Sequence, residues 1–274
     1  GGNYYDITPI RLTTIAGAVT FSATNGSSTL TITNVSHGAV GGDFVTFSGA
    51  VTLGGNITAA VLNQEYEIST VLTDDTYTVA AKDTSDVTVT ANALDTGNGG
   101  AAVIGTYQIN TGSATAVPFS GWGSGGWGLG TWGYSNASSS AIRLWSQSNY
   151  GEDLVFAYRG GPIFYWDAST GTSVRGKIVN IANYPTSSDV PSLVNIVSVS
   201  DIYRFVFAFG ANALGSTVQD PMLIRWSDQE SVIDWTPTAT NFAGSIRVSH
   251  GTEIIAVVQA RQEVLVWTDS ALYS

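Results

Sequence analysis

Short segments of alternating apolar and polar residues, separated by turn signals such as Asn25-Gly26, fill residues 12–109. Segments of about five residues at roughly ten-residue intervals are typical of a small β-barrel or β-sandwich. We therefore predict an inserted small β domain over residues 12–109. Its core strands, expected to supply the core face of one sheet, are residues 30–33, 44–47, 66–71 and 76–79.

Residues 110–274 show a different pattern, in which the strands are apolar on both faces. A unit made of an apolar strand, a polar turn and a second strand ending near a Trp occurs three times. The copies are residues 151–167, 203–228 and 251–269. Strands that are apolar on both faces must be covered on both sides, which in an all-β chain requires sheets packed on sheets.

The spacing of the repeated Trp residues indicates the kind of sheet stack. Trp226 and Trp267 are 41 positions apart, and Trp166 and Trp226 are 60 apart. The shorter step matches one four-stranded propeller blade, and the longer step matches a blade with an extended loop. We predict an all-β chain whose body, residues 110–274, is a partial β-propeller, with a β-sandwich as the alternative. Residues 1–11 are expected to form a lead strand of this body.

Composition narrows the classes of function. Charged residues make up 11% of the chain and the net charge is −11, so the surface should repel DNA rather than grip it. The inserted segment has eight acidic residues and one basic residue, Lys82. Cysteine is absent, which excludes disulfides and thiolate metal sites. No apolar run is long enough to span a membrane. The start without Met and the end directly after an apolar strand suggest a piece of a longer polypeptide.

The glycine-rich segment with Trp122, Trp127 and Trp132 at every fifth position is the most distinctive local feature. Indole faces at such positions could contact a host glycan or a neighbouring subunit. The alternative is that these side chains fill the subunit's own core while the glycines permit the turns.

Two segments each match only part of a nucleotide-binding motif. Residues 171–177 match the first part of a phosphate-binding loop, but Ile178 replaces the hydroxyl residue that would bind magnesium. Residues 123–128 have the glycine spacing of a dinucleotide site without the strand-turn-helix unit that it needs. We predict no cofactor.

Residues that could serve catalysis or metal binding are also better explained as structural. His37 and His250 have no metal-ligand spacing. Asp43 and the pair at positions 74–75 lie at turns and lack the alternating oxygens of a calcium loop. Glu152 and Asp153 could form a glycosidase couple, but the repeat places an acid at the same point in its last copy, which favours a strand-entry role. We predict no catalytic and no metal-binding residue.

Several segments resemble one family of viral proteins. Residues 2–11, 121–133, 225–238 and 262–273 are similar to the tail nozzle or hub (phage stabilisation) proteins of short-tailed bacteriophages. Residues 37–49 resemble a small β module found among phage structural proteins. The resemblance implies a ring of six copies in the virion tail, below the portal and adaptor, with tail fibres or spikes as further partners. The ring would surround the channel through which viral DNA passes without specific binding.

The function expected from these observations is that of a non-enzymatic structural subunit of a phage tail. Two alternatives remain open. One is a carbohydrate-binding or receptor-binding tail module that uses the Trp-rich segment. The other is a glycan-degrading tail enzyme that depends on Asp153.

Overall fold

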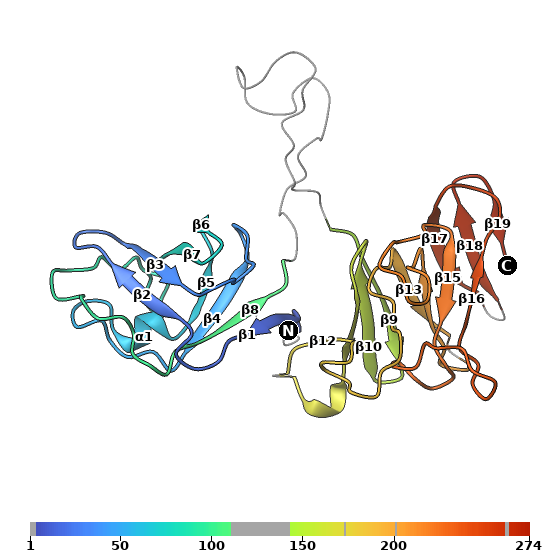
Figure 1. Ribbon diagram of the computed structural model, residues 1–274, viewed down its shortest axis with the longest axis horizontal. Helices are drawn as coiled ribbons and strands as arrows, with labels where there is room; N and C mark the ends of the chain where they lie inside the picture. Colours follow the sequence, from blue (N-terminus) through green and yellow to red (C-terminus); the bar gives the residue numbers. More distant parts are fainter. Residues whose placement is uncertain (1–3, 111–142, 173, 201, 261–262) are drawn as a thin grey trace, which may run out of the picture. The chain divides into compact units, whose positions relative to one another are not determined.

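The computed structural model describes residues 4–110, 143–172, 174–200, 202–260 and 263–274 (Figure 1). The chain forms two compact units, which we call the body (residues 1–9 and 141–274) and the inserted unit (residues 10–140). The described residues contain nineteen strands, one four-residue α-helix and one short 3-10 helix. The predicted all-β fold class is confirmed.

The inserted unit contains two four-stranded antiparallel sheets, with the strand orders β1-β8-β4-β5 and β2-β3-β7-β6. The helix α1 (Ala59–Leu62) precedes β5. The strands are β1 (Ile10–Thr13), β2 (Thr20–Ala23), β3 (Thr29–Thr33), β4 (Phe44–Ser48), β5 (Glu65–Glu67), β6 (Thr70–Thr73), β7 (Thr76–Ala80) and β8 (Ile104–Gln108). Leu30 and Tyr77 from one sheet and Val45 and Tyr107 from the other are fully buried in a single core. Of the two predicted architectures, the sandwich is the one observed.

The expectation that the predicted core strands form one sheet is wrong. β3 and β7 belong to one sheet, whereas β4 belongs to the other. The predicted strand over residues 66–71 is divided between β5, which pairs with β4, and β6, which pairs with β7. The connection over residues 34–43 is too long for a tight hairpin, and it carries the chain from one sheet to the next. β11 and β12 pair across a connection of the same length, so the length of a connection does not by itself decide which strands pair.

A hydrogen-bonded tyrosine pair links the two sheets inside this core. The hydroxyl groups of Tyr77 and Tyr107 are 2.9 Å apart, and the Tyr107 hydroxyl donates to Asn34 Oδ1 at 3.0 Å. Burial raises the pKa of both phenols, so both hydroxyl groups remain protonated. The pair supplies each buried oxygen with a partner, as burial of polar groups requires.

The lead segment is divided between the two units. Residues 1–9 belong to the body, whereas β1 pairs antiparallel with β8, with Ile10 opposite Gln108. Ile10 and Arg11 therefore belong to the inserted unit rather than to a lead strand of the body. The Arg11 guanidinium lies 5.6 Å from the centre of the Tyr107 ring and donates to the His37 carbonyl at 3.0 Å.

The body contains three antiparallel meanders in chain order, in which each strand pairs with its neighbour in sequence. The first sheet is β9 (Trp145–Tyr150), β10 (Asp153–Tyr158), β11 (Ile163–Trp166) and β12 (Lys177–Ile178). The second sheet is β13 (Ile196–Val199), β14 (Val206–Phe209), β15 (Leu223–Trp226) and β16 (Gly244–Arg247). The third sheet is β17 (Ile254–Gln259), β18 (Val264–Thr268) and β19 (Leu272–Tyr273).

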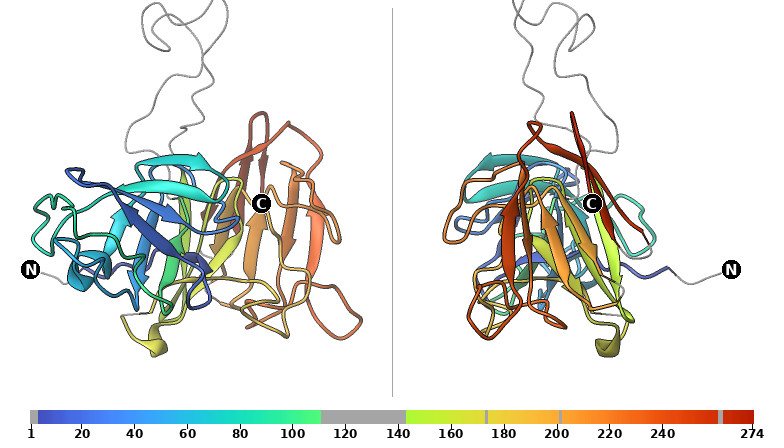
Figure 2. Two further views of the ribbon diagram at one scale, coloured as in Figure 1. Left: turned by 60° about the vertical axis from the view of Figure 1, so that its left-hand side comes forward. Right: turned by 90° about the vertical axis from the view of Figure 1, so that its right-hand side faces the viewer.

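These three sheets are stacked one upon another, as Figures 1 and 2 show. Val155 of the first sheet and Val206 of the second lie in one buried cluster. Phe209 of the second sheet packs with Ile254 and Val266 of the third in another. The second sheet is thus covered on both faces, as predicted for strands that are apolar on both sides.

The first strands of successive sheets lie next to one another, as in propeller blades. The backbone N–H groups of Val197 and Val199 on β13 donate to Ser146 Oγ at 3.0 Å and Ser148 Oγ at 3.1 Å on β9. β13 also approaches β17. The body is therefore a propeller-like stack of sheets.

The sequence repeat corresponds to a hairpin rather than to a whole sheet. Each predicted strand pair forms an antiparallel hairpin, β10–β11, β14–β15 and β17–β18. Trp166 and Trp226 lie on the third strand of their sheets, whereas Trp267 lies on the second of the three strands in its sheet. The repeat thus describes how strands pair locally and does not describe how the sheets stack.

Candidate assembly interface

The third sheet packs on the second sheet with one face and exposes the other. The inward side chains include Ile254 and Val266, which are buried. The residues that alternate with the inward ones point away from the second sheet, and Val258 (53% exposed) and Leu272 (56%) are the most accessible among them. We call this surface the outward face. Its side chains are Ile255, Ala256, Val258, Leu265, Trp267 and Leu272.

The register shows why these side chains share one surface. Val258 lies opposite Leu265, and Trp267 lies opposite both Ala256 and Leu272 on the neighbouring strands. A bulge at the start of β17 adds Ile255 to the same side. All six residues are apolar in a chain with a net charge of −11. Contiguous exposed apolar surface of this kind marks interaction sites.

Acidic residues border the outward face. Glu253 precedes β17, Glu263 precedes β18 and Asp269 follows it. The Asp269 carboxylate accepts hydrogen bonds from the Thr252 hydroxyl at 2.7 Å and the Thr252 N–H at 2.8 Å. These bonds hold the pKa of Asp269 below its ordinary value. Asp269 is therefore ionised at neutral pH.

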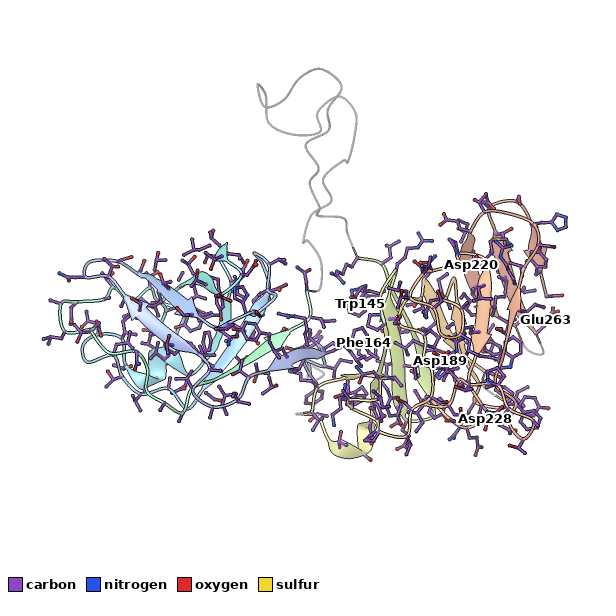
Figure 3. The ribbon with its side chains drawn as sticks, viewed as in Figure 1. Trp145, Phe164, Asp189, Asp220, Asp228 and Glu263 are labelled. Atoms are coloured by element: carbon purple, nitrogen blue, oxygen red, sulfur yellow. The ribbon has the colours of Figure 1, made fainter. Side chains whose placement is uncertain are left out.

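The opposite end of the stack, on the first sheet, is aromatic. Phe156 and Phe164 stack with ring centres 5.4 Å apart, and Trp145 meets Tyr158 edge to face at 5.5 Å. Trp145 is 41% exposed. Figure 3 places Trp145 and Phe164 at this end of the body and Glu263 at the other.

Two arginines accompany these aromatic side chains. The Arg143 guanidinium lies 4.0 Å from the centre of the Tyr158 ring, within cation–π distance. Arg159 is exposed at the turn after β10. Within the described part of the chain, neither arginine forms an ion pair with an acidic side chain. We call Arg143, Trp145, Tyr158 and Arg159 the first-sheet end.

Residues of the lead segment bind to the connection between β11 and β12 of the first sheet. Arg175 and Asp6 form an ion pair at 2.5 Å, and the Gly176 N–H donates to the Ile7 carbonyl at 3.0 Å. A Cβ atom at Gly176 would lie 2.7 Å from the Phe156 ring, so glycine is required for this close approach.

Arg225 is a structural residue that sequence reasoning missed. It lies on β15 with its side chain 2% exposed. Its guanidinium donates to the carbonyl oxygens of Asn212, Asp189 and Trp235 and to the Asp189 carboxylate at 3.1 Å. Burial lowers the pKa of Arg225, although the Asp189 charge opposes this shift. The only sequence signal was one charged residue within the apolar run that ends at Trp226.

The three Trp residues predicted as a contact platform, Trp122, Trp127 and Trp132, lie outside the described residues. The glycine motif at 123–128 lies outside them as well. The partial phosphate-loop motif ends on β12, where Lys177 is a strand residue. Gly171 follows the 3-10 helix Ala168–Thr170.

The predicted titratable residues are engaged in local hydrogen bonds. Buried His37 accepts the Ala39 N–H on Nδ1 at 3.0 Å, and exposed His250 lies 3.0 Å from Ser249 Oγ. Asp43 accepts the Val40 N–H at 2.9 Å. Within the residues that the structure describes, no three His, Asp or Glu side chains gather where they could hold a metal ion.

Asp153 is the first residue of β10, and its carboxylate holds the start of this strand through two hydrogen bonds. Its carboxylate accepts the Tyr165 hydroxyl and the Ala168 N–H, the latter at 2.9 Å. Burial and the Asp153 charge raise the pKa of Tyr165, which keeps this hydroxyl protonated as a donor. These contacts link β10 to the turn after β11.

A groove of about 490 Å³ lies beside β12 and is lined mainly by apolar side chains such as Ile178, Val190 and Pro191. Its one charged lining residue is Asp189, whose carboxylate already accepts from Arg225 and from the Gly215 N–H. The groove therefore offers no free ionised group for a ligand.

No family model and no curated protein matches this chain. One solved structure that is similar is the endosialidase of phage phi92, with 15% identity and a TM-score of 0.24. The match covers 96% of this chain and 35% of that protein, so this chain spans about a third of its length. A TM-score this low does not indicate a shared fold. No helix in the described ranges is long and apolar enough to cross a membrane.

Proposed function

We propose that this chain is a non-enzymatic structural subunit of the tail of a short-tailed bacteriophage, in the nozzle or hub ring around the DNA exit channel. The resemblance of four segments to tail nozzle and hub proteins supports this assignment. The partners would be further copies of the chain, six in the ring, together with portal-proximal adaptor proteins and tail fibres or spikes.

The observation that carries the proposal is the propeller-like stack of three sheets in the body. The middle sheet is buried on both faces, with Val206 in one buried cluster and Phe209 in the other. A body made of sheets packed on sheets suits a protein whose role is structural.

The net charge of the chain also supports a position around a DNA channel. The net charge of −11 repels phosphate, so DNA would slide past the protein without being held. The acid-rich inserted unit adds to this repulsion.

Antibody labelling of virions tests the proposal. An antibody raised against residues 10–110 should decorate the tails of purified particles of the phage that encodes the chain, and electron microscopy should show a ring at that position. Absence of the chain from purified virions would contradict the proposal.

An assay for sugar release tests the non-enzymatic part separately. The chain should release no sugar from host polysaccharide. Release that disappears in Asp153→Ala would show a glycan-degrading enzyme instead.

A further inference from the structure

We propose that Asn98 is a site of spontaneous deamidation in the folded protein, whereas Asn25 is protected from the same reaction. Both residues precede a glycine and lie in the inserted unit. The co-reactant is water, and the products are ammonia and an aspartate or isoaspartate at position 98. The inference goes beyond the proposed function and does not depend on it, because it concerns only contacts within the inserted unit.

An asparagine that precedes a glycine reacts with its own main chain. The amide nitrogen of the glycine loses its proton and attacks Cγ of the asparagine side chain, which forms a bond from this nitrogen to Cγ. The bond from Cγ to the side-chain nitrogen breaks, and this nitrogen takes up a proton and leaves as ammonia. Water then opens the resulting succinimide ring at either carbonyl carbon, which gives aspartate or isoaspartate.

The two glycine nitrogens differ in their hydrogen bonds. The Gly26 N–H donates to the Ala91 carbonyl oxygen at 2.9 Å. The Gly99 N–H donates to no group in the described parts of the chain. Because the nitrogen must lose its proton before it attacks, a hydrogen bond that holds the proton slows the reaction at Gly26. Gly99 therefore has the nitrogen that is free to react.

The Asn98 side chain is folded toward this nitrogen. Its Oδ1 atom accepts the Gly100 N–H at 3.1 Å. A side chain that bonds to the N–H two residues ahead lies over the intervening peptide group, so its Cγ atom is held near the Gly99 nitrogen. The same hydrogen bond stabilises the negative charge that develops on Oδ1 during the attack. Asn98 is exposed, so water reaches the succinimide.

Deamidation at this position would affect the junction between the two sheets of the inserted unit. The Asn98 carbonyl accepts the Phe21 N–H of β2 at 3.0 Å, and the Gly99 carbonyl accepts the Val51 N–H, just after β4, at 2.8 Å. β2 and β4 belong to different sheets. Isoaspartate adds a carbon atom to the main chain and converts the Asn98 carbonyl to a carboxylate. Both hydrogen bonds should therefore weaken.

Ageing of the full chain tests the inference. The chain is incubated at mildly alkaline pH, in one sample folded and in another unfolded by urea, and then digested with trypsin. Cleavage after Arg11, Lys82 and Arg143 places Asn25 in peptide 12–82 and Asn98 in peptide 83–143. Mass spectrometry of peptide fragments locates the product. In the folded sample, deamidation at Asn98 should be at least about tenfold faster than at Asn25. In urea the two rates should be similar.

Two variants test the effect on the junction. Asn98→Ser removes the reactive amide and keeps an oxygen that accepts the Gly100 N–H, and Asn25→Ser is the matched control. On ageing, the amide protons of Phe21 and Val51 should exchange several-fold faster in the unaltered chain and in Asn25→Ser, but not in Asn98→Ser. Exchange before ageing checks that the variants are folded, and Asn98→Gln replaces Asn98→Ser if that variant unfolds.

Three results would overturn the inference. The first is absence of product at Asn98 in the folded chain, and the second is deamidation of Asn25 at the same rate. The third is a preference for Asn98 that persists in urea, because local sequence rather than the folded structure would then be its cause. Equal exchange of Phe21 and Val51 in aged Asn98→Ser and the aged unaltered chain would overturn the effect on the junction.

Discussion

At the scale of single residues, buried polar side chains that bind several backbone groups hold the segments between the strands in place. Arg225 ties three connecting segments to the middle sheet of the body through Asn212, Asp189 and Trp235. In the inserted unit, the Asp95 carboxylate accepts four backbone N–H groups and is 4% exposed. Both groups are stable in the interior because their hydrogen-bonding capacity is used.

Replacement of Arg225 by Met should destabilise the body. The carbonyl oxygens of Asn212 and Trp235 would lose their buried donor, at a cost of about 3 kcal/mol in the free energy of unfolding. Urea unfolding followed by Trp fluorescence measures this loss. Arg247→Met is the control, because Arg247 forms an exposed ion pair with Asp220 and its loss should cost under about 1 kcal/mol. Equal losses in both variants would contradict the assigned role of Arg225.

Asp95 should make the stability of the inserted unit dependent on pH. Burial alone would raise the pKa of Asp95, but the four N–H donors hold it below its ordinary value. The ionised carboxylate therefore stabilises the folded state above the unfolded-state pKa of about 3.9, and this contribution is lost as the pH falls toward the folded-state pKa.

Asp95→Asn should reduce the stability of the inserted unit at pH 7 by about 1–3 kcal/mol and weaken its dependence on acid pH. Thermal melts of residues 10–110 between pH 3 and pH 7 measure both effects. Asp74→Asn, at an exposed turn, should behave like the unaltered protein. If the stability of Asp95→Asn depends on acid pH as strongly as that of the unaltered protein, the Asp95 carboxylate is not the cause of this dependence.

At the scale of the elements, the contact between the first strands of successive sheets depends on serine side chains. β13 is an edge strand, and the N–H groups of Val197 and Val199 donate to the hydroxyl groups of Ser146 and Ser148 on β9. Serine also leaves room for the close approach of two backbones. Two small polar residues thus join separate sheets without extending either ladder.

Replacement of both Ser146 and Ser148 by Ala should loosen this junction. The two amide protons of Val197 and Val199 should exchange with solvent several-fold faster, and the body should lose about 1 kcal/mol for each hydrogen bond. Hydrogen exchange resolved by residue measures the first effect and urea unfolding the second. Gln147→Ala, on the exposed side of β9, should change neither quantity.

At the scale of the whole molecule, the chain combines two units with different cores. The described part of the inserted unit starts on β1 and ends just after β8, and these two strands are paired. An insertion whose ends lie side by side can join a host domain without disturbing it. Each core is made from residues of its own unit.

Residues 10–110 should therefore fold as an isolated fragment. We expect a single cooperative thermal transition, because this segment contains both sheets and the complete core. A fragment that starts at residue 14 lacks β1 and the Arg11 contacts with Tyr107 and His37, so it should melt at a lower temperature. Non-cooperative melting of the longer fragment would show that the inserted unit depends on the body.

The sequence by itself determined the all-β class and the three Trp-ending hairpins, because alternation and turn residues act between near neighbours. Only the tertiary structure decided that β3 and β4 join different sheets, that Ile10 and Arg11 belong to the inserted unit, and that Arg225 is buried. It also decided which sheets cover the two faces of the second sheet. These features depend on contacts between residues far apart in the chain, and a pattern of apolar positions does not specify which distant surface will cover them.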